Sequence, residues 1–141
     1  MTTNPKSPGQ PHSQPARTIL IVDDDQEFRE ALAESVRRDG FQVEMAKTGL
    51  EALDRLRWGL RPCVILLDMQ MGKMTGWDFR AEQMRDRTLA AIPVIAMTAG
   101  PWKERDLGDY AGRIAKPIDL ADLRARLDRY RLPSESQISP G

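Results

Sequence analysis

An unbroken apolar run, Cys63 to Leu67, leads directly into Asp68. The run shows no alternation of polar and apolar residues, which is typical of a strand buried on both faces in the middle of a parallel sheet. Open α/β sheets bind their ligands at the carboxyl ends of such strands. Asp68 is therefore a candidate functional residue, although an aspartate after a strand also often caps a helix or closes a turn.

Polar groups follow three other short apolar runs in the same way, namely Asp23-Asp24-Asp25 after residues 18–22, Thr98-Ala99 after residues 94–97, and Lys116-Pro117 after residues 113–115. A parallel sheet would bring these carboxylates, the hydroxyl and the ammonium group to one edge. Together they have the parts of a phosphate-binding site. Taken alone, Lys116 could equally be a surface lysine before a turn proline, and Asp25 is expected to face solvent and cap the first helix.

The segments between these strands have the spacing of helices. In chain order, the predicted apolar faces are Phe28, Leu32 and Val36; Leu50, Leu53, Leu56 and Leu60; Trp77, Ala81 and Met84, with Phe79 pointing elsewhere; and Leu120, Leu123, Leu127 and Tyr130. Phe41, Val43 and Met45 alternate, which predicts a further, half-exposed strand. This β-α alternation predicts an α/β protein with a five-stranded parallel sheet and helices on both faces.

Composition predicts one domain between two tails. Residues 1–16 and 132–141 are polar and lack apolar periodicity, so we expect flexible tails around a domain of residues 17–131. The only histidine, His12, lies in the first tail and is given no role.

Charge and cysteine content limit the partners and the compartment. Lys plus Arg and Asp plus Glu both number 21, which points to neither nucleic acid nor a membrane surface as a partner. Cys63 is the only cysteine, so no disulfide framework or zinc site is expected. No stretch reaches the ~20 apolar residues of a membrane span, and no signal peptide is recognisable, so we expect a cytoplasmic protein.

The motifs Asp23-Asp24, Asp68 with Met71 and Gly76 behind it, Thr98-Ala99 and Lys116-Pro117 resemble those of the receiver domain of two-component response regulators, over about residues 17–131. The resemblance implies a flavodoxin-like fold with strand order 2-1-3-4-5. It also implies a single-domain regulator, not an enzyme acting on other molecules, that accepts a phosphoryl group on Asp68 from a sensor histidine kinase or phosphotransfer protein. The output would be contact with an unknown target protein, and a weak homodimer is allowed.

Three clustered carboxylates would repel one another unless a cation lay between them, and oxygen ligands suit Mg²⁺, with Mn²⁺ as a substitute. By resemblance, Asp24 and Asp68 bind the ion directly, Asp23 mainly through water, and Gln70 through its backbone carbonyl. The phosphoryl oxygens would be bound by the Met69 backbone, the Thr98 hydroxyl, the Ala99 backbone and the Lys116 ammonium group. The resemblance further implies a cis peptide bond before Pro117.

Two departures from the family concern its phosphorylation switch, which pairs Thr98 with an aromatic residue. Arg113 replaces that aromatic, and we expect it to remain in solvent because burying an unpaired guanidinium is costly. The segment from Thr98 to Lys116 is short by ~4 residues, about one helical turn, and contains Gly100-Pro101, so the fourth helix is expected to be short or irregular. Signalling is then expected to rearrange residues 100–109.

Two other classes of protein stay open at this stage. Phosphatases of the haloacid-dehalogenase type also use an aspartate after a strand, but they need a second aspartate where this chain has Gln70. A pure interaction module with an unused site is the other alternative, and the complete set Asp24, Asp68, Thr98 and Lys116 speaks against it.

Overall fold

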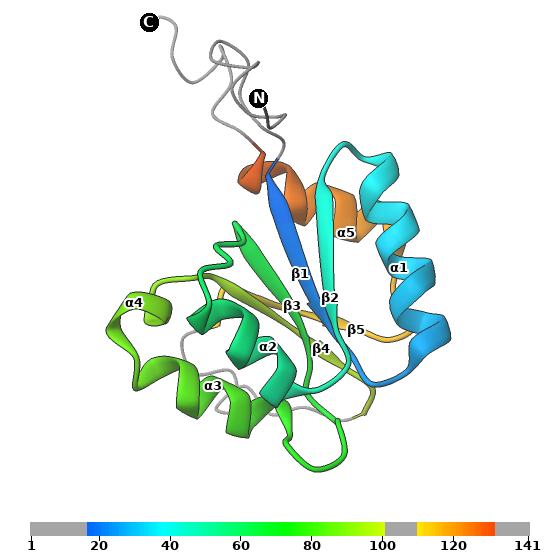
Figure 1. Cartoon of the computed structure of the whole chain (residues 1–141). Helices are drawn as coiled ribbons and strands as arrows, with labels where there is room; N and C mark the ends of the chain where they lie inside the picture. Colours follow the sequence, from blue (N-terminus) through cyan, green and yellow to red (C-terminus); the bar gives the residue numbers. More distant parts are fainter. Residues whose placement is uncertain (1–16, 101–109, 132–141) are drawn as a thin grey trace, which may run out of the picture.

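The computed structural model describes residues 17–100 and 110–131, so both predicted tails lie outside the described residues. The described strands are β1 (Thr18–Val22), β2 (Gln42–Ala46), β3 (Val64–Asp68), β4 (Val94–Thr98) and β5 (Gly112–Ala115). They form one sheet of five parallel strands in the order β2-β1-β3-β4-β5 (Figure 1). The predicted sheet and its strand order are confirmed.

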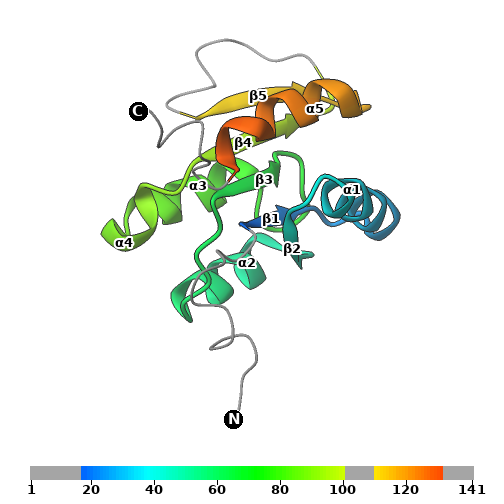
Figure 2. The same ribbon diagram turned by 90° about the horizontal axis from the view of Figure 1, so that it is seen from above.

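Helices cover both faces of the sheet, as predicted (Figure 2). They are α1 (Gln26–Arg38), α2 (Gly49–Arg57), α3 (Gly76–Met84), α4 (Arg87–Ala90) and α5 (Leu120–Leu127), which a 3-10 turn, η2 (Asp128–Tyr130), extends. Alternate residues of the central strands enter two separate cores: Ile19 and Leu66 pack with α1 and α5, whereas Leu20 and Leu67 pack with α2 and α3. Burial on both faces explains why β3 is apolar from Val64 to Leu67, up to Asp68 at its end.

Local sequence sets the ends of the helices. Asp25, Thr48, Thr75 and Asp119 each accept a backbone N–H of the following helix with their side chains. These contacts satisfy donors that the first turn of a helix leaves without an intrahelical partner. After α1, Gly40 adopts a φ of +98°, a conformation that L side chains rarely adopt.

The predicted apolar faces of α2, α3 and α5 need correction. In α5, Leu123 and Leu127 are buried but Leu120 is 52% exposed. In α3 Phe79 is fully buried, whereas Trp77 and Met84 are 39% and 42% exposed. Gln83 is buried beside Phe79, and its Nε2 donates to two backbone carbonyls, those of Leu89 at 2.9 Å and Ile92 at 3.0 Å. A buried polar residue thus occupies the inner face, which the apolar pattern could not indicate.

In α2, Leu53 and Leu56 are buried as predicted, but Leu50 in the first turn is 57% exposed. Leu60 follows the end of the helix at Arg57 and packs against the core from the loop. The buried stripe of α2 is therefore shorter than the leucine spacing suggested.

The short helix α4 precedes β4, so it is not the short or irregular helix that was expected between β4 and β5. That prediction falls on residues 101–109, which lie outside the described residues. Among the helices that the structure describes, none is long and apolar enough to cross a membrane.

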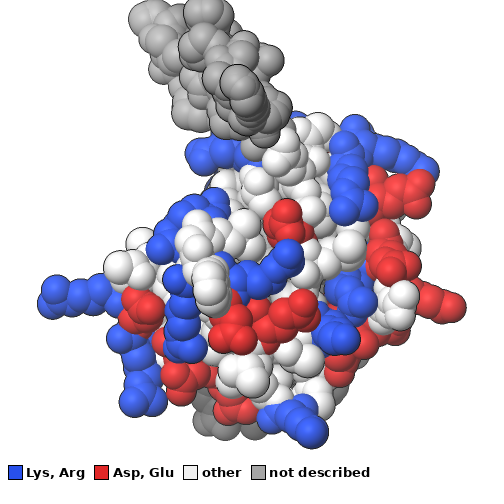
Figure 3. Space-filling model, viewed as in Figure 1, with Lys and Arg blue, Asp and Glu red and all other residues white. Residues whose placement is uncertain are grey.

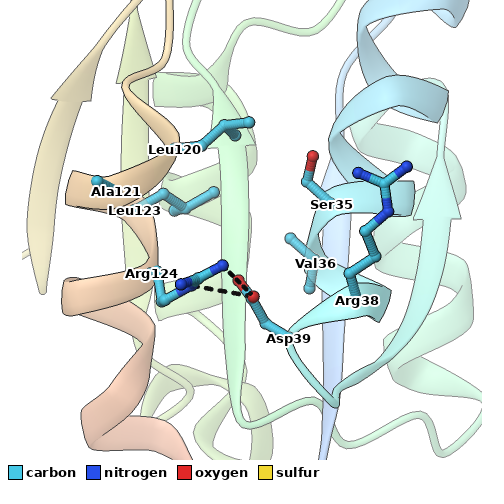
Figure 4. Close-up of a pocket in the computed structure, with 8 residues that line it drawn as sticks. All are labelled: Ser35, Val36, Arg38, Asp39, Leu120, Ala121, Leu123 and Arg124. Atoms are coloured by element: carbon cyan, nitrogen blue, oxygen red, sulfur yellow. Dashed lines mark hydrogen bonds and ion pairs between the residues drawn. The ribbon is translucent and has the colours of Figure 1, made fainter.

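A pocket lies along the seam between α1 and α5 (Figure 4). Val36 and Leu123 form part of its apolar lining, and Ser35 and Leu120 lie toward the same end of the seam. An ion pair between the Arg124 guanidinium and the Asp39 carboxylate, with N–O distances of 3.0 Å, joins the two elements at the other end.

Candidate functional site

The register of the sheet places the predicted polar residues at one edge. Asp68 pairs with Met97, the residue before Thr98, and Thr98 pairs with Ala115, the residue before Lys116. The Lys116 N–H donates to the Thr98 carbonyl at 2.7 Å, which continues the sheet ladder into the site. The carboxyl ends of β1, β3, β4 and β5 therefore bring together side chains that are up to 93 residues apart in the chain.

Three carboxylates form the centre of this edge. One oxygen each of Asp23, Asp24 and Asp68 lies within 4.8 Å of the others. Asp23 is fully buried, Asp68 is 4% exposed, and Asp24 is open to solvent. A donor set of oxygens only, with one carboxylate accessible from solvent, fits a hard divalent cation such as Mg²⁺.

Lys116 places an ammonium group beside two of these carboxylates. Its Nζ lies 2.9 Å from Asp23 Oδ2 and 3.6 Å from Asp68 Oδ1. The same ammonium group lies 4.3 Å from the centre of the Phe28 ring, a favourable cation–π contact. The peptide bond between Lys116 and Pro117 is cis. Lys116 therefore faces the carboxylates and is not a surface lysine.

Asp23 is held by several protein donors. Its Oδ1 accepts the Asp25 N–H at 2.9 Å and its Oδ2 accepts Lys116, while Arg29 Nη1 donates to its backbone carbonyl at 2.7 Å. Sequence reasoning missed Phe28 and Arg29 as neighbours of the site, because both belong to an ordinary helical pattern in α1. Asp24 is less constrained, with the Gly72 N–H 3.3 Å from its Oδ2.

Burial raises the pKa of the Asp68 carboxyl group above its ordinary value. The Gln70 N–H, which donates to Asp68 Oδ1 at 3.0 Å, opposes that rise, as does Lys116. The charges of Asp23 and Asp24 raise the pKa further. The ionised form of Asp68 is therefore destabilised in the folded protein, and a bound cation would stabilise it.

The backbone N–H groups of the residues after Asp68 have acceptors within the protein. The Met69 N–H donates to the Met97 carbonyl at 3.0 Å and is thus engaged in the sheet, while the Gln70 N–H is the one that faces the Asp68 carboxylate. Thr98 is 4% exposed beside the site. The Ala99 N–H donates to the side-chain Oε1 of Gln70 at 3.3 Å.

Gly76 lets the first turn of α3 approach the end of β3. A Cβ atom at this position would lie 2.6 Å from Met69 Cα and 2.9 Å from the Asp68 carbonyl oxygen, both backbone atoms that cannot move aside cheaply. The Gly76 N–H also donates to the Met69 carbonyl at 3.2 Å. A glycine is therefore required to keep Asp68 and the loop after it in place.

We expect Gly76→Ala to lower the free energy of unfolding by about 1–3 kcal/mol, the usual cost of forcing extra atoms into a packed region. Thermal and urea denaturation measure the change. Gly72→Ala is the matched control, because a Cβ there meets nothing within 4 Å. Equal stability of the two variants would show that the contact at Gly76 is not limiting.

The family model of the response regulator receiver domain matches residues 19–128. The chain belongs to this family. Response regulator MprA of Mycobacterium sp. (strain KMS) is 36% identical over 129 residues, which cover 86% of this chain and 55% of that protein. MprA of Mycobacterium tuberculosis (strain ATCC 25177 / H37Ra) is 37% identical over 113 residues, 77% of this chain and 48% of that protein.

The receiver domain thus spans about half the length of these curated relatives. Among solved structures, the Vibrio cholerae chemotaxis protein CheY4 is similar with a TM-score of 0.75 and 26% identity, covering 82% of this chain and 99% of that one. The N-terminal domain of a response regulator receiver protein from Methanoculleus marisnigri JR1 has a TM-score of 0.67 and 28% identity, covering 79% of this chain and 94% of that one. Both agree with the flavodoxin-like topology.

The protein is accordingly a response regulator receiver domain of a two-component system. In this receiver domain Arg113 is exposed on β5, opposite Ala96 of β4. The expected rearrangement of residues 100–109 falls almost wholly on the segment outside the described residues.

Proposed function

We propose that this receiver domain accepts a phosphoryl group on Asp68 from the phosphohistidine of a sensor kinase or phosphotransfer protein, with Mg²⁺, and signals by contact with a target protein. One observation carries this proposal. The Lys116 Nζ lies 3.6 Å from Asp68 Oδ1, and Asp68 belongs to a cluster of three carboxylates with one oxygen each within 4.8 Å of the others. A nucleophile, a cation and a set of metal ligands thus share one edge.

The metal would be held by the carboxylates of Asp24 and Asp68 and the backbone carbonyl of Gln70, with Asp23 acting through water, and Mn²⁺ could replace Mg²⁺. When bound, the ion neutralises negative charge on the phosphoryl oxygens. Asp23 fits an indirect role, because both of its oxygens already accept hydrogen bonds from protein donors.

Asp68 acts as the nucleophile in the proposed transfer. A bond forms between its carboxylate oxygen and phosphorus while the bond between phosphorus and the donor's imidazole nitrogen breaks, and the electron pair of that bond stays on the imidazole. The Lys116 ammonium, the Thr98 hydroxyl and the Ala99 N–H donate to the phosphoryl oxygens. These groups position the phosphoryl group, which is most of what phosphoryl transfer requires.

The direct experiment incubates the protein with acetyl phosphate and Mg²⁺ and measures its intact mass. We expect one added phosphoryl group that hydroxylamine removes, because hydroxylamine cleaves acyl phosphates. Absence of labelling would favour the alternative of an interaction module with an unused site. A label that resists hydroxylamine would contradict an aspartyl phosphate.

The surface beside Lys116 fits a protein donor. An apolar hollow there is lined by Phe28, Leu32, Pro117, Ile118 and Leu120, and it shares Ser35 and Leu120 with the α1–α5 pocket (Figure 4). Charges on the face shown in Figure 3 are interspersed in sign, with no large basic patch of the kind that binds nucleic acid. We infer that the donor's phosphohistidine domain docks in this hollow.

Leu120→Asp should reduce transfer from a phosphohistidine protein by about tenfold, since it places a charge in the hollow. Labelling by acetyl phosphate should stay unchanged, and the fold should tolerate the change because Leu120 is 52% exposed. Leu50→Asp is the control, as Leu50 is similarly exposed but lines a different hollow. Equal transfer to both variants would remove the docking assignment.

A further inference from the structure

The Gln70 side chain accepts a hydrogen bond from a backbone N–H group that the proposed function assigns to the phosphoryl group. Its Oε1 accepts the Ala99 N–H at 3.3 Å, which links the loop after β3 to the end of β4, 29 residues further along the chain. The same N–H is one of the proposed donors to the phosphoryl group. An N–H group directed at the carboxamide oxygen must be released before it can bond a phosphoryl oxygen.

The register explains why these two residues meet. Asp68 of β3 pairs with Met97 of β4, and Gln70 and Ala99 each lie two residues after this pair. The segments that follow the two strands therefore leave the sheet side by side. The Gln70 N–H donates to Asp68 Oδ1 at 3.0 Å and fixes the Gln70 backbone beside the carboxylate. The two methylenes of the side chain then let its oxygen cross to Ala99.

We propose that Gln70 is a placeholder for the phosphoryl group: its carboxamide oxygen holds the Ala99 N–H in the unphosphorylated domain, and an incoming phosphoryl oxygen must displace it. This inference rests on the proposed function, because it assigns Ala99 to the phosphoryl group. It makes Gln70 a positioning residue that keeps the end of β4 aligned with the loop after β3 in the absence of a ligand.

Charge decides the direction of the exchange. A carboxamide oxygen is neutral, whereas a phosphoryl oxygen is charged and forms a hydrogen bond roughly twice as strong. Displacement is therefore favourable, but it forfeits a contact whose net worth corresponds to about twofold to tenfold in affinity. Loss of the placeholder should tighten phosphoryl binding by that factor, and a charged placeholder should weaken it.

The test compares Gln70→Met, which keeps the length but lacks an acceptor, with Gln70→Glu, which provides a charged one. The probe is beryllofluoride, a phosphoryl mimic, at saturating Mg²⁺, with affinity measured by calorimetry. We expect the Met variant to bind about twofold to tenfold more tightly than the natural protein, and the Glu variant to bind more weakly by at least about tenfold because its carboxylate also repels the anion. If substitution of Gln70 merely loosened the loop after β3, both variants would change the affinity in the same direction.

Gln42→Met is the matched control. Gln42 is exposed at the amino end of β2, whereas the site lies at the carboxyl ends of the strands. We expect this control to bind beryllofluoride as the natural protein does. If the Met and Glu variants at position 70 shift affinity in the same direction, or if Gln42→Met tightens binding as much as Gln70→Met, the placeholder is refuted.

A second readout needs no phosphoryl group. In the metal-free protein, amide hydrogen exchange at Ala99 should be about twofold to tenfold faster in Gln70→Met than in the natural protein, because the acceptor is gone. Equal exchange at Ala99 would overturn the placeholder. If the natural protein fails to bind beryllofluoride, the proposed function fails, and the exchange measurement alone decides whether Gln70 holds the Ala99 N–H.

Discussion

We expect Asp68→Asn to abolish phosphoryl uptake from acetyl phosphate. The carboxamide has nearly the same size and can keep the Gln70 N–H contact, but it lacks the ionised oxygen that must attack phosphorus. The substitution also removes a charge that burial disfavours, so the metal-free protein should be at least as stable as the natural one. Intact mass after incubation with acetyl phosphate and Mg²⁺ measures uptake, and thermal denaturation measures stability.

Asp25→Asn is the control for this experiment. Asp25 belongs to the same acidic run, but its side chain caps α1 by accepting the Phe28 N–H at 3.1 Å. Asparagine is also a good helix cap, so this variant should fold and be labelled normally. Persistent hydroxylamine-sensitive labelling of Asp68→Asn would show that the acceptor lies elsewhere.

Asp24→Ala should lose Mg²⁺ affinity and phosphoryl uptake together. Changing a residue that only supports a metal ligand typically costs 10–100-fold in affinity, so removal of a ligand should cost at least about that much. The fold should persist, because Asp24 is exposed and removing it relieves repulsion with the other two carboxylates. A Mg²⁺ titration by calorimetry and circular dichroism measure the two properties.

Asp54→Ala is the matched control, since Asp54 is an exposed aspartate on α2 outside the acidic cluster. It should leave Mg²⁺ affinity unchanged. Normal Mg²⁺ binding by Asp24→Ala, or its unfolding without the metal, would contradict the assignment of Asp24 as a ligand.

The predicted apolar face was correct for α1, whereas α2 and α5 each expose one predicted leucine, Leu50 and Leu120, and α3 buries polar groups. Leu32 and Val36 in α1 are buried as their spacing indicates. In α3 the inner face contains Arg80 and Gln83 beside Phe79, and Arg80 Nη1 donates to Gln83 Oε1 at 2.7 Å. Burial of a polar pair depends on partners from other segments, so a hydrophobic pattern cannot reveal it.

The residues at the carboxyl ends of the strands could be predicted from the sequence, because apolar runs and the polar residues after them are local features. The sequence thereby identified Asp68, Asp24, Thr98 and Lys116 as members of one edge of a parallel sheet. How the groups at that edge pair with one another could not be predicted in this way and is seen in the folded domain. These contacts join distant segments. Lys116 contacts Asp23 and Phe28, the Met69 N–H donates to the Met97 carbonyl, and the Gln70 side chain accepts the Ala99 N–H. Their geometry follows from strand register and from close packing of the whole domain, neither of which is encoded in the spacing of any one segment.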